Sequence, residues 1–224
     1  MKENELRQAF VKNAESYAGV KEGSARHKFI VDTYNTISPL PRNYKVKYTD
    51  SWCATFVSAM AKLCGITKIV APECSCQKQI DLFKQMGAFV ENDSYVPSAG
   101  DIIYYDWQDS GTGDNTGWAD HVGIVVGVNG NKIRVIEGNM NDAVNYRTID
   151  VNGKFIRGFA VPKYASIAEK ENPVIAKNET EIAKEWAIKN GVFKGDANGE
   201  YNWKKEITRE QIAIVLYRLF NKKN

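Results

Sequence analysis

Residues 50–65 read DSWCATFVSAMAKLCG, and this stretch decides the character of the first half of the chain. Its apolar residues recur at helical spacing, which predicts an amphipathic helix. Asp50 or Ser51 can cap the start of this helix, and Gly65 suits the position just past its end. Cys53 therefore falls in the first helical turn. The apolar stripe consists of Phe56, Val57, Met60, Ala61 and Cys64.

A different pattern begins after Gly100. Short runs rich in Val, Ile, Tyr and Phe alternate with turn residues, which is typical of strands. The connections are short, so we expect an antiparallel sheet. Helices followed by a strand meander predict an α+β domain, in which N-terminal helices pack on the sheet. The expected strands are DIIYYD (101–106), HVGIVVGV (121–128), KIRVIEGN (132–139), VNYRTIDV (144–151) and KFIRGFAVP (154–162).

Composition and charge exclude several classes of protein. The chain has 224 residues, with 30 basic and 27 acidic side chains and a net charge of +3. The basic surplus is spread evenly, which argues against nucleic acid as a partner. No apolar run approaches the roughly 18 residues of a membrane helix, so no membrane insertion is expected. The N-terminus, MKENELRQAFVKNAE, does not resemble a secretory signal, so we expect a protein made in the cytoplasm without a signal peptide.

The composition shifts near Pro162, where PKYASIAEKENPVIAKN (162–178) carries two prolines, scattered charge and little apolar periodicity. This stretch is typical of a linker. We therefore predict a domain over residues 1–164, a linker over 165–178, and a small helical hairpin domain over 179–224.

The chain has four cysteines, Cys53, Cys64, Cys74 and Cys76. They do not form the dense pattern of a disulfide framework. Cys74-Ser-Cys76 lacks the spacing and the second pair of ligands that a metal site needs. No metal and no cofactor are therefore expected. The pattern places Cys53 alone at a helix start, so we expect the other three cysteines to be dispensable.

Cys53 is the candidate nucleophile, because a helix N-terminus favours the reactive thiolate. His121 opens a strand, and Glu137 and Asn139 close the next one. The order Cys…His…Glu-x-Asn matches a nucleophile, its base and a group that orients the base. Taken singly, a cysteine on an apolar helix or a histidine at a strand end is more often structural. A three-residue loop over 129–131 would put His121 opposite Asn139, with Glu137 on the same face of the sheet.

Four segments resemble the CHAP domain, the cysteine, histidine-dependent amidohydrolase/peptidase module. They are SWCATFVSAM, GDIIYYDW, DHVGIVVGV and IEGNM, and the resemblance covers about residues 1–164. It implies a papain-like fold and cleavage of amide bonds in peptidoglycan. By this resemblance Cys53 attacks the amide carbon, His121 transfers the proton, and Glu137 or Asn139 orients the imidazole. Related NlpC-type peptidases share the architecture, but Trp52 and the Glu-x-Asn pair favour the CHAP domain.

Candidate substrate-binding residues lie beside this constellation. The stretch WQDSGTGDNTGWAD (107–120) is rich in Gly and Asp and ends at the candidate base, so it is a natural wall of a substrate groove. A disordered hairpin loop is an equal alternative. Trp107 and Trp118 belong to this stretch, and Asp50 precedes the nucleophile. Some CHAP domains bind calcium through several aspartates before the cysteine, but here NYKVKYTD contains only Asp50.

The C-terminal stretch AIKNGVFKGDANGEYNWKKEITREQIAIVLYRLF resembles one S-layer homology motif, over about residues 179–221. The resemblance implies binding to a cell-wall polymer, with Arg209 as the anion contact at a helix N-terminus. Such motifs usually come in threes, and this chain carries one. Either the chain forms a homo-oligomer through residues 179–221, or the motif binds alone and weakly.

Together these resemblances imply a peptidoglycan hydrolase joined to a wall-binding module. A phage endolysin, which reaches the bacterial cell wall after release from the cytoplasm, fits the expected lack of a signal. A bacterial autolysin or a secreted toxin is the second enzyme interpretation. A non-catalytic wall-binding or S-layer-associated protein with a protease-like domain is the alternative from another class. The residues do not choose between an N-acetylmuramoyl-L-alanine amidase and a peptidoglycan endopeptidase.

Overall fold

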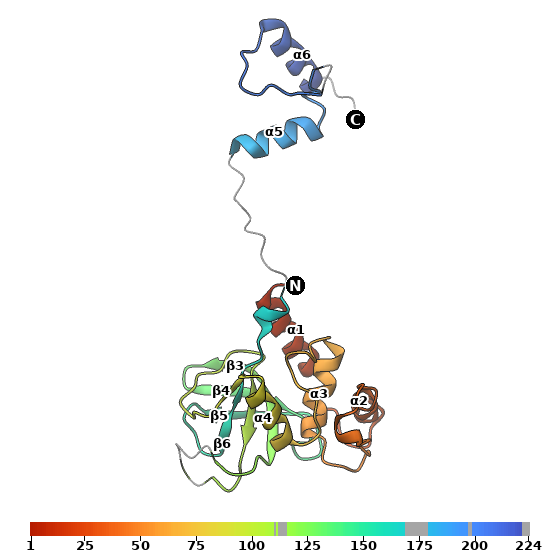
Figure 1. The fold of residues 1–224 in the computed structure, drawn as a ribbon, viewed down its shortest axis with the longest axis vertical. Coiled ribbons are helices and arrows are strands. Elements are labelled where there is room, and N and C mark those ends of the chain that lie inside the picture. The colour runs from red at the N-terminus through yellow and green to blue at the C-terminus, as the bar shows by residue number, and fades with distance from the viewer. Residues whose placement is uncertain (110, 112–115, 169–178, 197–198, 221–224) are drawn as a thin grey trace. The chain divides into compact units, whose positions relative to one another are not determined.

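The computed structural model describes residues 1–109, 111, 116–168, 179–196 and 199–220 (Figure 1). The chain divides into two compact units, Met1–Lys170 and Glu171–Asn224. Positions 169–178 of the expected linker lie outside the described residues. The functional assignment of the two domains stays a prediction.

The first unit contains one sheet, which the described residues build from six strands in the order β1-β6-β2-β3-β4-β5. Every pairing is antiparallel, as the short connections predict. The five expected strands correspond to β2 through β6, and β1 is a short addition beside β6 that the sequence analysis missed. The strands are β1 (Phe89–Val90), β2 (Ile102–Tyr105), β3 (His121–Asn129), β4 (Lys132–Glu137), β5 (Asn145–Asp150) and β6 (Ile156–Ala160).

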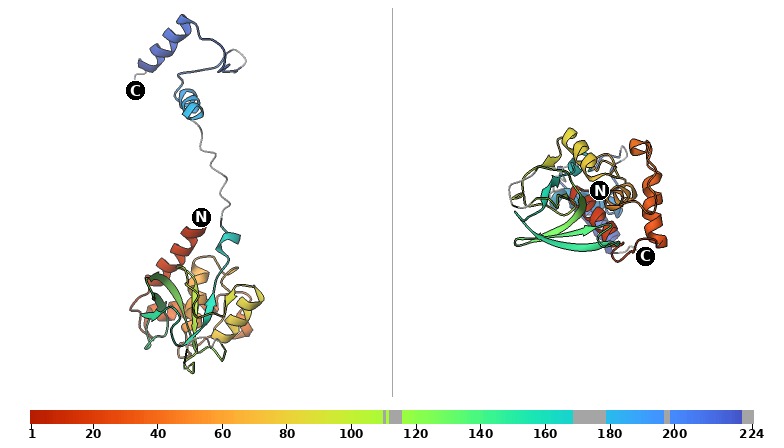
Figure 2. Two further views of the ribbon diagram at one scale, coloured as in Figure 1. Left: turned by 90° about the vertical axis from the view of Figure 1, so that its left-hand side faces the viewer. Right: turned by 90° about the horizontal axis from the view of Figure 1, so that it is seen from below.

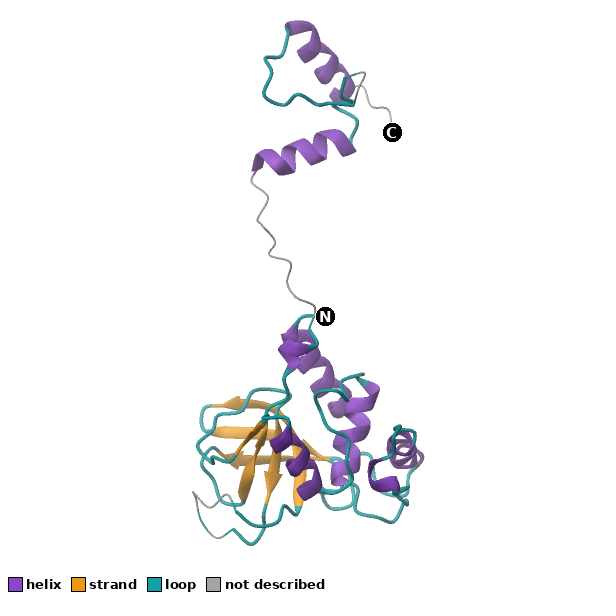
Figure 3. Ribbon diagram, in the orientation of Figure 1, coloured by secondary structure: helices purple, strands orange, loops and turns teal. Residues whose placement is uncertain are grey.

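Helices precede the main part of the sheet, so the mixture of helices and antiparallel strands is confirmed (Figure 3). Two of these helices, α2 and α4, were not predicted. Within the described residues, none of the helices combines the length and apolarity needed to cross a membrane. The helices of the first unit are α1 (Glu3–Glu15), α2 (Ala25–Asn35), η1 (Pro41–Asn43), α3 (Cys53–Leu63), α4 (Cys76–Gln85) and η2 (Tyr164–Ser166).

Both faces of the sheet are apolar, and this explains the uninterrupted run IIYY in β2. Helices α1 and α3 pack against one another and against β3 (Figures 1 and 2). Ile102 and Tyr104 point into the large core beneath these helices, whereas Ile103 and Tyr105 point into a smaller cluster on the opposite face. A strand buried on both sides reads as a continuous apolar segment instead of an alternating one.

The turn between β3 and β4 differs from the prediction. Asn129 pairs with Lys132, so the loop is the two-residue turn Gly130-Asn131, and the expected three-residue loop is wrong. The extra residue lies inside the strand instead, because the register shifts by one between Val125 and Gly127. This bulge has the same effect on side-chain direction as an odd-length loop would have. On the side of the bulge away from the turn, the start of β3 pairs with the end of β4 so that His121 and Glu137 lie on the same face of the sheet.

The second unit contains α5 (Glu179–Lys189) and α6 (Arg209–Phe220). Thr208 and Gln211 form a capping box at the start of α6. The Thr208 N–H donates to Gln211 Oε1 at 2.8 Å, and the Gln211 N–H donates to Thr208 Oγ1 at 3.2 Å. A helical hairpin domain stays a prediction. Large apolar side chains of α6 are exposed, namely Ile212, Ile214, Leu216, Leu219 and Phe220.

Candidate active site

Cys53 is the first residue of α3, as the sequence predicts. The expected cap is wrong: Trp52 occupies the N-cap position, and no side chain caps the helix. Trp52 is fully buried and donates through Nε1 to Glu22 Oε2 at 3.0 Å, which holds the start of the helix in place. The free N–H groups of a first helical turn favour negative charge, so the Cys53 sulfur lies where a thiolate is stabilised.

The close approach of β4 to this helix depends on Gly138. A Cβ added at Gly138 would lie 2.4 Å from the Cβ of Phe56 and 2.7 Å from its Cγ, distances that no real side chain tolerates. Only a glycine therefore lets the chain just after β4 pass against α3. The glycines of β3 do not face this helix in the same way: a Cβ at Gly123 would meet Val135 and Glu137, and one at Gly127 would meet nothing within 4 Å.

His121 and Glu137 meet at one edge of the sheet. His121 opens β3, Glu137 ends β4, and His121 Nε2 lies 3.0 Å from Glu137 Oε2. Glu137 is fully buried and His121 is 9% exposed. Because Nε2 is engaged by the carboxylate, Nδ1 is the ring nitrogen left to serve Cys53.

Arg147 completes this cluster, and the sequence analysis missed it. Its Nε donates to Glu137 Oε1 at 2.8 Å and its Nη2 donates to Oε2 at 3.1 Å. In β5, Asn145 pairs with Glu137 and Arg147 pairs with Val135, so Arg147 shares the face of Glu137 one alternation away. The expected strand VNYRTIDV contains Arg147, but its contact with Glu137 can be inferred only when the register between β4 and β5 is known.

Aromatic rings cover this carboxylate cluster. The ring of Tyr105 lies 5.9 Å from that of His121 and stacks on Trp107 at 5.1 Å, with an interplanar angle of 11°. The guanidinium of Arg147 lies over both, 5.3 Å from the Tyr105 centroid and 5.1 Å from that of Trp107. The rings of Tyr105 and Trp107 therefore both lie beside the His121 imidazole.

A second cysteine lies against Cys53. The sulfur of Cys76 is 3.6 Å from that of Cys53, and both are free thiols. Cys76 is the first residue of α4, so the expectation that only Cys53 starts a helix is wrong. The sequence did carry a signal for α4, since Ser75 precedes an apolar series at i, i+4 and i+7 made of Cys76, Ile80 and Phe83.

Electrostatics favour a thiolate on Cys53 and a proton on His121. The hydrogen bond from Cys76 is the largest cause that lowers the pKa of Cys53 well below its ordinary value; burial opposes it, and His121 adds to it. Burial alone would lower the pKa of His121, but Cys53 and Glu137 outweigh burial and raise this pKa to about 9. Burial likewise opposes ionisation of Glu137, yet His121 and Arg147 keep the pKa of its carboxyl below the ordinary value.

The remaining predicted residues differ in their surroundings. Asn139 is half-buried in the turn after β4, with a left-handed φ of 60°, and among the described residues no hydrogen bond joins it to His121. Trp107 is 40% exposed, and its ring centre lies 6.0 Å from that of His121. Trp118 is 61% exposed, with the Lys78 ammonium 6.0 Å above its ring.

Asp50 is engaged within its own loop, where its Oδ2 accepts from Tyr44 Oη at 2.7 Å and from the Lys47 N–H at 2.8 Å. Arg209 belongs to the second unit, where it is the exposed first residue of α6. Residues 110 and 112–115 of the predicted groove wall lie outside the described residues.

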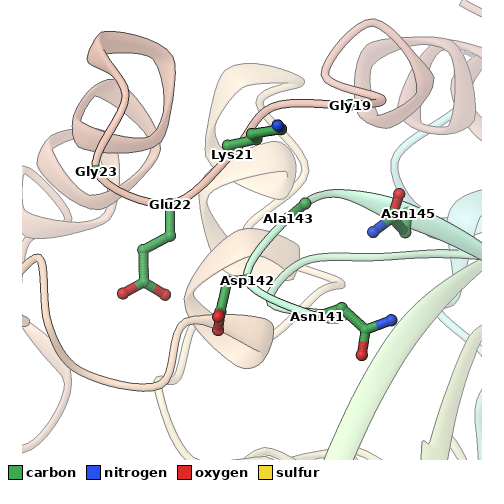
Figure 4. Close-up of a pocket in the computed structure, with 8 residues that line it drawn as sticks. All are labelled: Gly19, Lys21, Glu22, Gly23, Asn141, Asp142, Ala143 and Asn145. Carbon is green, nitrogen blue, oxygen red and sulfur yellow. The ribbon is translucent and has the colours of Figure 1, made fainter.

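A polar hollow of 640 Å³ lies between residues 19–23 and residues 141–145. The two segments are joined by a bridge between Lys21 and Ala143. Figure 4 shows the carboxylates of Glu22 and Asp142 extending to the same side of these segments. Glu22 lines this hollow, and its carboxylate also accepts a hydrogen bond from Trp52, the N-cap residue of α3. Across the part of the chain that the structure describes, no three His, Cys, Asp or Glu side chains gather as a metal site.

Comparison with known proteins bears on the family of the chain and not on single residues. No curated protein and no solved structure matches the chain. One family model does match, the CHAP domain, over residues 43–139, a stretch that contains Cys53, His121 and Glu137. CHAP domains are in general hydrolases that act on peptidoglycan, as amidases or endopeptidases. The residues that converge around Cys53 thus lie in a segment whose family match supports a CHAP-domain protein.

Proposed function

We propose that this protein hydrolyses an amide bond of bacterial peptidoglycan with Cys53 as the nucleophile. One observation carries the proposal: His121, hydrogen-bonded to the Glu137 carboxylate that Arg147 holds, interacts with a cysteine at the first turn of a helix. A cysteine, a base and a group that orients the base are the minimum set for nucleophilic acyl transfer.

The reaction takes place in two stages. The Cys53 thiolate attacks the amide carbon, the C–N bond breaks, and His121 gives its proton to the leaving amine, which leaves a thioester on Cys53. Water then attacks the thioester carbon, His121 accepts a proton from that water, and the acid product leaves with the thiolate restored. The N–H groups at the start of α3 stabilise the oxyanion in both stages. Glu137 keeps the imidazole oriented, and Arg147 keeps Glu137 ionised.

The substrate side of the proposal involves the exposed rings beside the cluster. Trp107 and Trp118 offer apolar surface for sugar or peptide groups, and Asp50 lies close in sequence to the nucleophile. The fragments released from the wall show which bond is cut, either the muramic acid–L-alanine amide or a bond within the peptide. Mass spectrometry that finds new N-terminal L-alanine indicates an amidase.

Turbidity of a suspension of Gram-positive cell walls tests catalysis. The native chain should clear the suspension, and Cys53→Ala should not, while sedimentation shows that the variant still binds walls. Cys64→Ala is the matched control, since Cys64 is a half-buried thiol at the far end of the same helix. Clearing by Cys53→Ala, or sedimentation with walls but no clearing by the native chain, would refute cysteine catalysis. The second outcome would favour a wall-binding protein.

We further propose that the second unit targets the enzyme to the wall in an endolysin-like role, after release from the cytoplasm. The capping box leaves Arg209 exposed at the first turn of α6, where a helix N-terminus attracts anions. The exposed apolar side chains of α6 support self-association through residues 179–221. Arg209→Ala should weaken sedimentation with walls, and light scattering should give more than a monomer mass. Unchanged sedimentation would contradict the role of Arg209 in wall binding. A monomer mass would contradict self-association.

A further inference from the structure

We propose that Cys76 is a positioning residue for the nucleophile: its thiol donates a hydrogen bond to the Cys53 thiolate and keeps that thiolate formed and in place. This inference rests on the proposed role of Cys53. It gives a function to a cysteine that the sequence analysis expected to be dispensable.

The geometry of the two sulfurs supports this role. They lie 3.6 Å apart, within hydrogen-bonding distance for sulfur, and each belongs to the first residue of a helix. Cys53 is 6% exposed and Cys76 is 7% exposed. Water therefore has little room to solvate a charge on either sulfur, and a hydrogen bond from the neighbouring thiol replaces part of that solvation.

A buried polar network holds α4 against α3. Ser58, in the middle of α3, donates through Oγ to the Glu73 carbonyl at 2.7 Å and accepts from the Glu73 N–H at 2.8 Å. Gln79 of α4 donates to the Ala71 carbonyl at 2.7 Å and accepts from Tyr104 Oη at 2.9 Å. Ser58, Gln79 and Tyr104 are fully buried, so the two helix starts have little freedom to separate.

The groups around the two sulfurs set the direction of the hydrogen bond. His121 acts on Cys53 and favours its ionised form. The Cys53 thiolate, then burial, and finally the Asp120 carboxylate raise the pKa of Cys76 well above its ordinary value. Tyr104 of β2 also faces the pair, and burial keeps its phenol neutral by raising its pKa. The charge therefore belongs to Cys53 and the proton to Cys76, so Cys76 is the donor.

The alkylation rate of Cys53 by iodoacetamide, followed from pH 4 to pH 9, reports this hydrogen bond without any need for a substrate. Only the thiolate reacts, so the midpoint of the rate gives the pKa of the nucleophile. Trypsin isolates Cys53 in the peptide 48–62, whereas Cys74 and Cys76 share the peptide 69–78. Mass spectrometry of the first peptide therefore follows Cys53 alone.

Three variants separate a hydrogen bond from packing. Cys76→Ala lacks a donor and should raise the midpoint by about one pH unit, which makes alkylation below it roughly tenfold slower. Cys76→Ser retains a donor and should restore most of the native midpoint. Cys74→Ala changes the neighbouring cysteine, whose sulfur accepts from Arg42 instead, and should leave the midpoint unchanged. If Cys76→Ala fails to fold, Cys76→Val supplies a donor-free side chain of greater volume.

A donor-free variant that folds and keeps the native midpoint would overturn the proposal. So would Cys76→Ser if its midpoint shifted as far as that of Cys76→Ala, because packing and not hydrogen bonding would then matter. The two proposals fail separately. Wall clearing by Cys53→Ala would refute the role of Cys53 as nucleophile, whereas an unchanged midpoint would refute only the role of Cys76.

Discussion

The ion pair between Arg147 and Glu137 should be the most costly polar contact of the site to break, and Arg147→Met tests this. Methionine keeps most of the apolar length of the side chain but removes both hydrogen bonds to Glu137, at 2.8 Å and 3.1 Å. The carboxylate is fully buried, and in the variant it would keep its hydrogen bond to His121 but lose the compensating charge of Arg147.

The magnitude follows from the burial of the two partners. Breaking a fully buried pair costs about 3–5 kcal/mol, because a charge stays buried without compensation. The Arg147 side chain is 29% exposed, so water can reach part of the vacated site and reduce the cost. We expect a loss of roughly 2–3 kcal/mol in the free energy of unfolding.

Urea unfolding of the full chain at pH 7, followed by circular dichroism, measures this loss. Arg134→Met is the matched control: Arg134 lies on the neighbouring strand, is exposed, and stacks on Tyr146 with its guanidinium 4.0 Å from the ring centre. It should cost no more than about 1 kcal/mol. Equal losses in the two variants would refute the argument that Arg147 stabilises a buried carboxylate.

Arg147→Met should also change how the free energy of unfolding depends on pH in the acid range. The folded-state pKa of Glu137 is lowered, so its contribution is present above the ordinary carboxyl pKa and disappears as the pH falls through the folded value. Burial raises the pKa of Glu137, and Arg147 lowers it. Without Arg147 the carboxyl should therefore take up a proton at a higher pH. The stability of Arg147→Met should therefore begin to fall at a higher pH than that of the native chain.

Three further predictions follow from the site. Because the folded pKa of His121 is raised to about 9, its stabilising contribution is complete below the ordinary value near 6.5 and is lost as the pH rises through 9. An NMR titration of its imidazole should show a midpoint near 9 that falls in Cys53→Ala, and a native midpoint near 6.5 would contradict the thiolate–imidazolium pair. Gly138→Ala should lower the free energy of unfolding by about 1–3 kcal/mol, because the added Cβ would overlap Phe56. Gly127→Ala is the control and should lower it less, because nothing lies within 4 Å of its added Cβ. Equal urea midpoints for the two variants would disprove the close approach. Diamide, which accepts two electrons and two protons from two thiols, should join Cys53 to Cys76, link peptides 48–62 and 69–78, and abolish wall clearing until dithiothreitol is added. Linkage of Cys53 to any other cysteine would argue against the observed pairing.

The local pattern of the sequence was sufficient to predict the helix that begins at Cys53 and the strands that carry His121 and Glu137. These features depend on periodicity and turn residues, which are written in neighbouring positions of the chain. The order Cys…His…Glu-x-Asn also stands in the sequence. It left two residues open as the partner of His121, and the structure shows the hydrogen bond to Glu137.

Only the tertiary structure decided which distant residues complete the site. The prediction of the β3–β4 turn was wrong, yet His121 and Glu137 share a face, because a bulge between Val125 and Gly127 supplies the odd residue that the loop lacks. Local preferences do not locate such a bulge, since it depends on how the sheet curves around its core. Arg147 reaches Glu137 through strand register, and Cys76 reaches Cys53 through the packing of α4 on α3. Both contacts join residues whose proximity arises from the pairing and burial of whole elements, and no pattern within either segment encodes it.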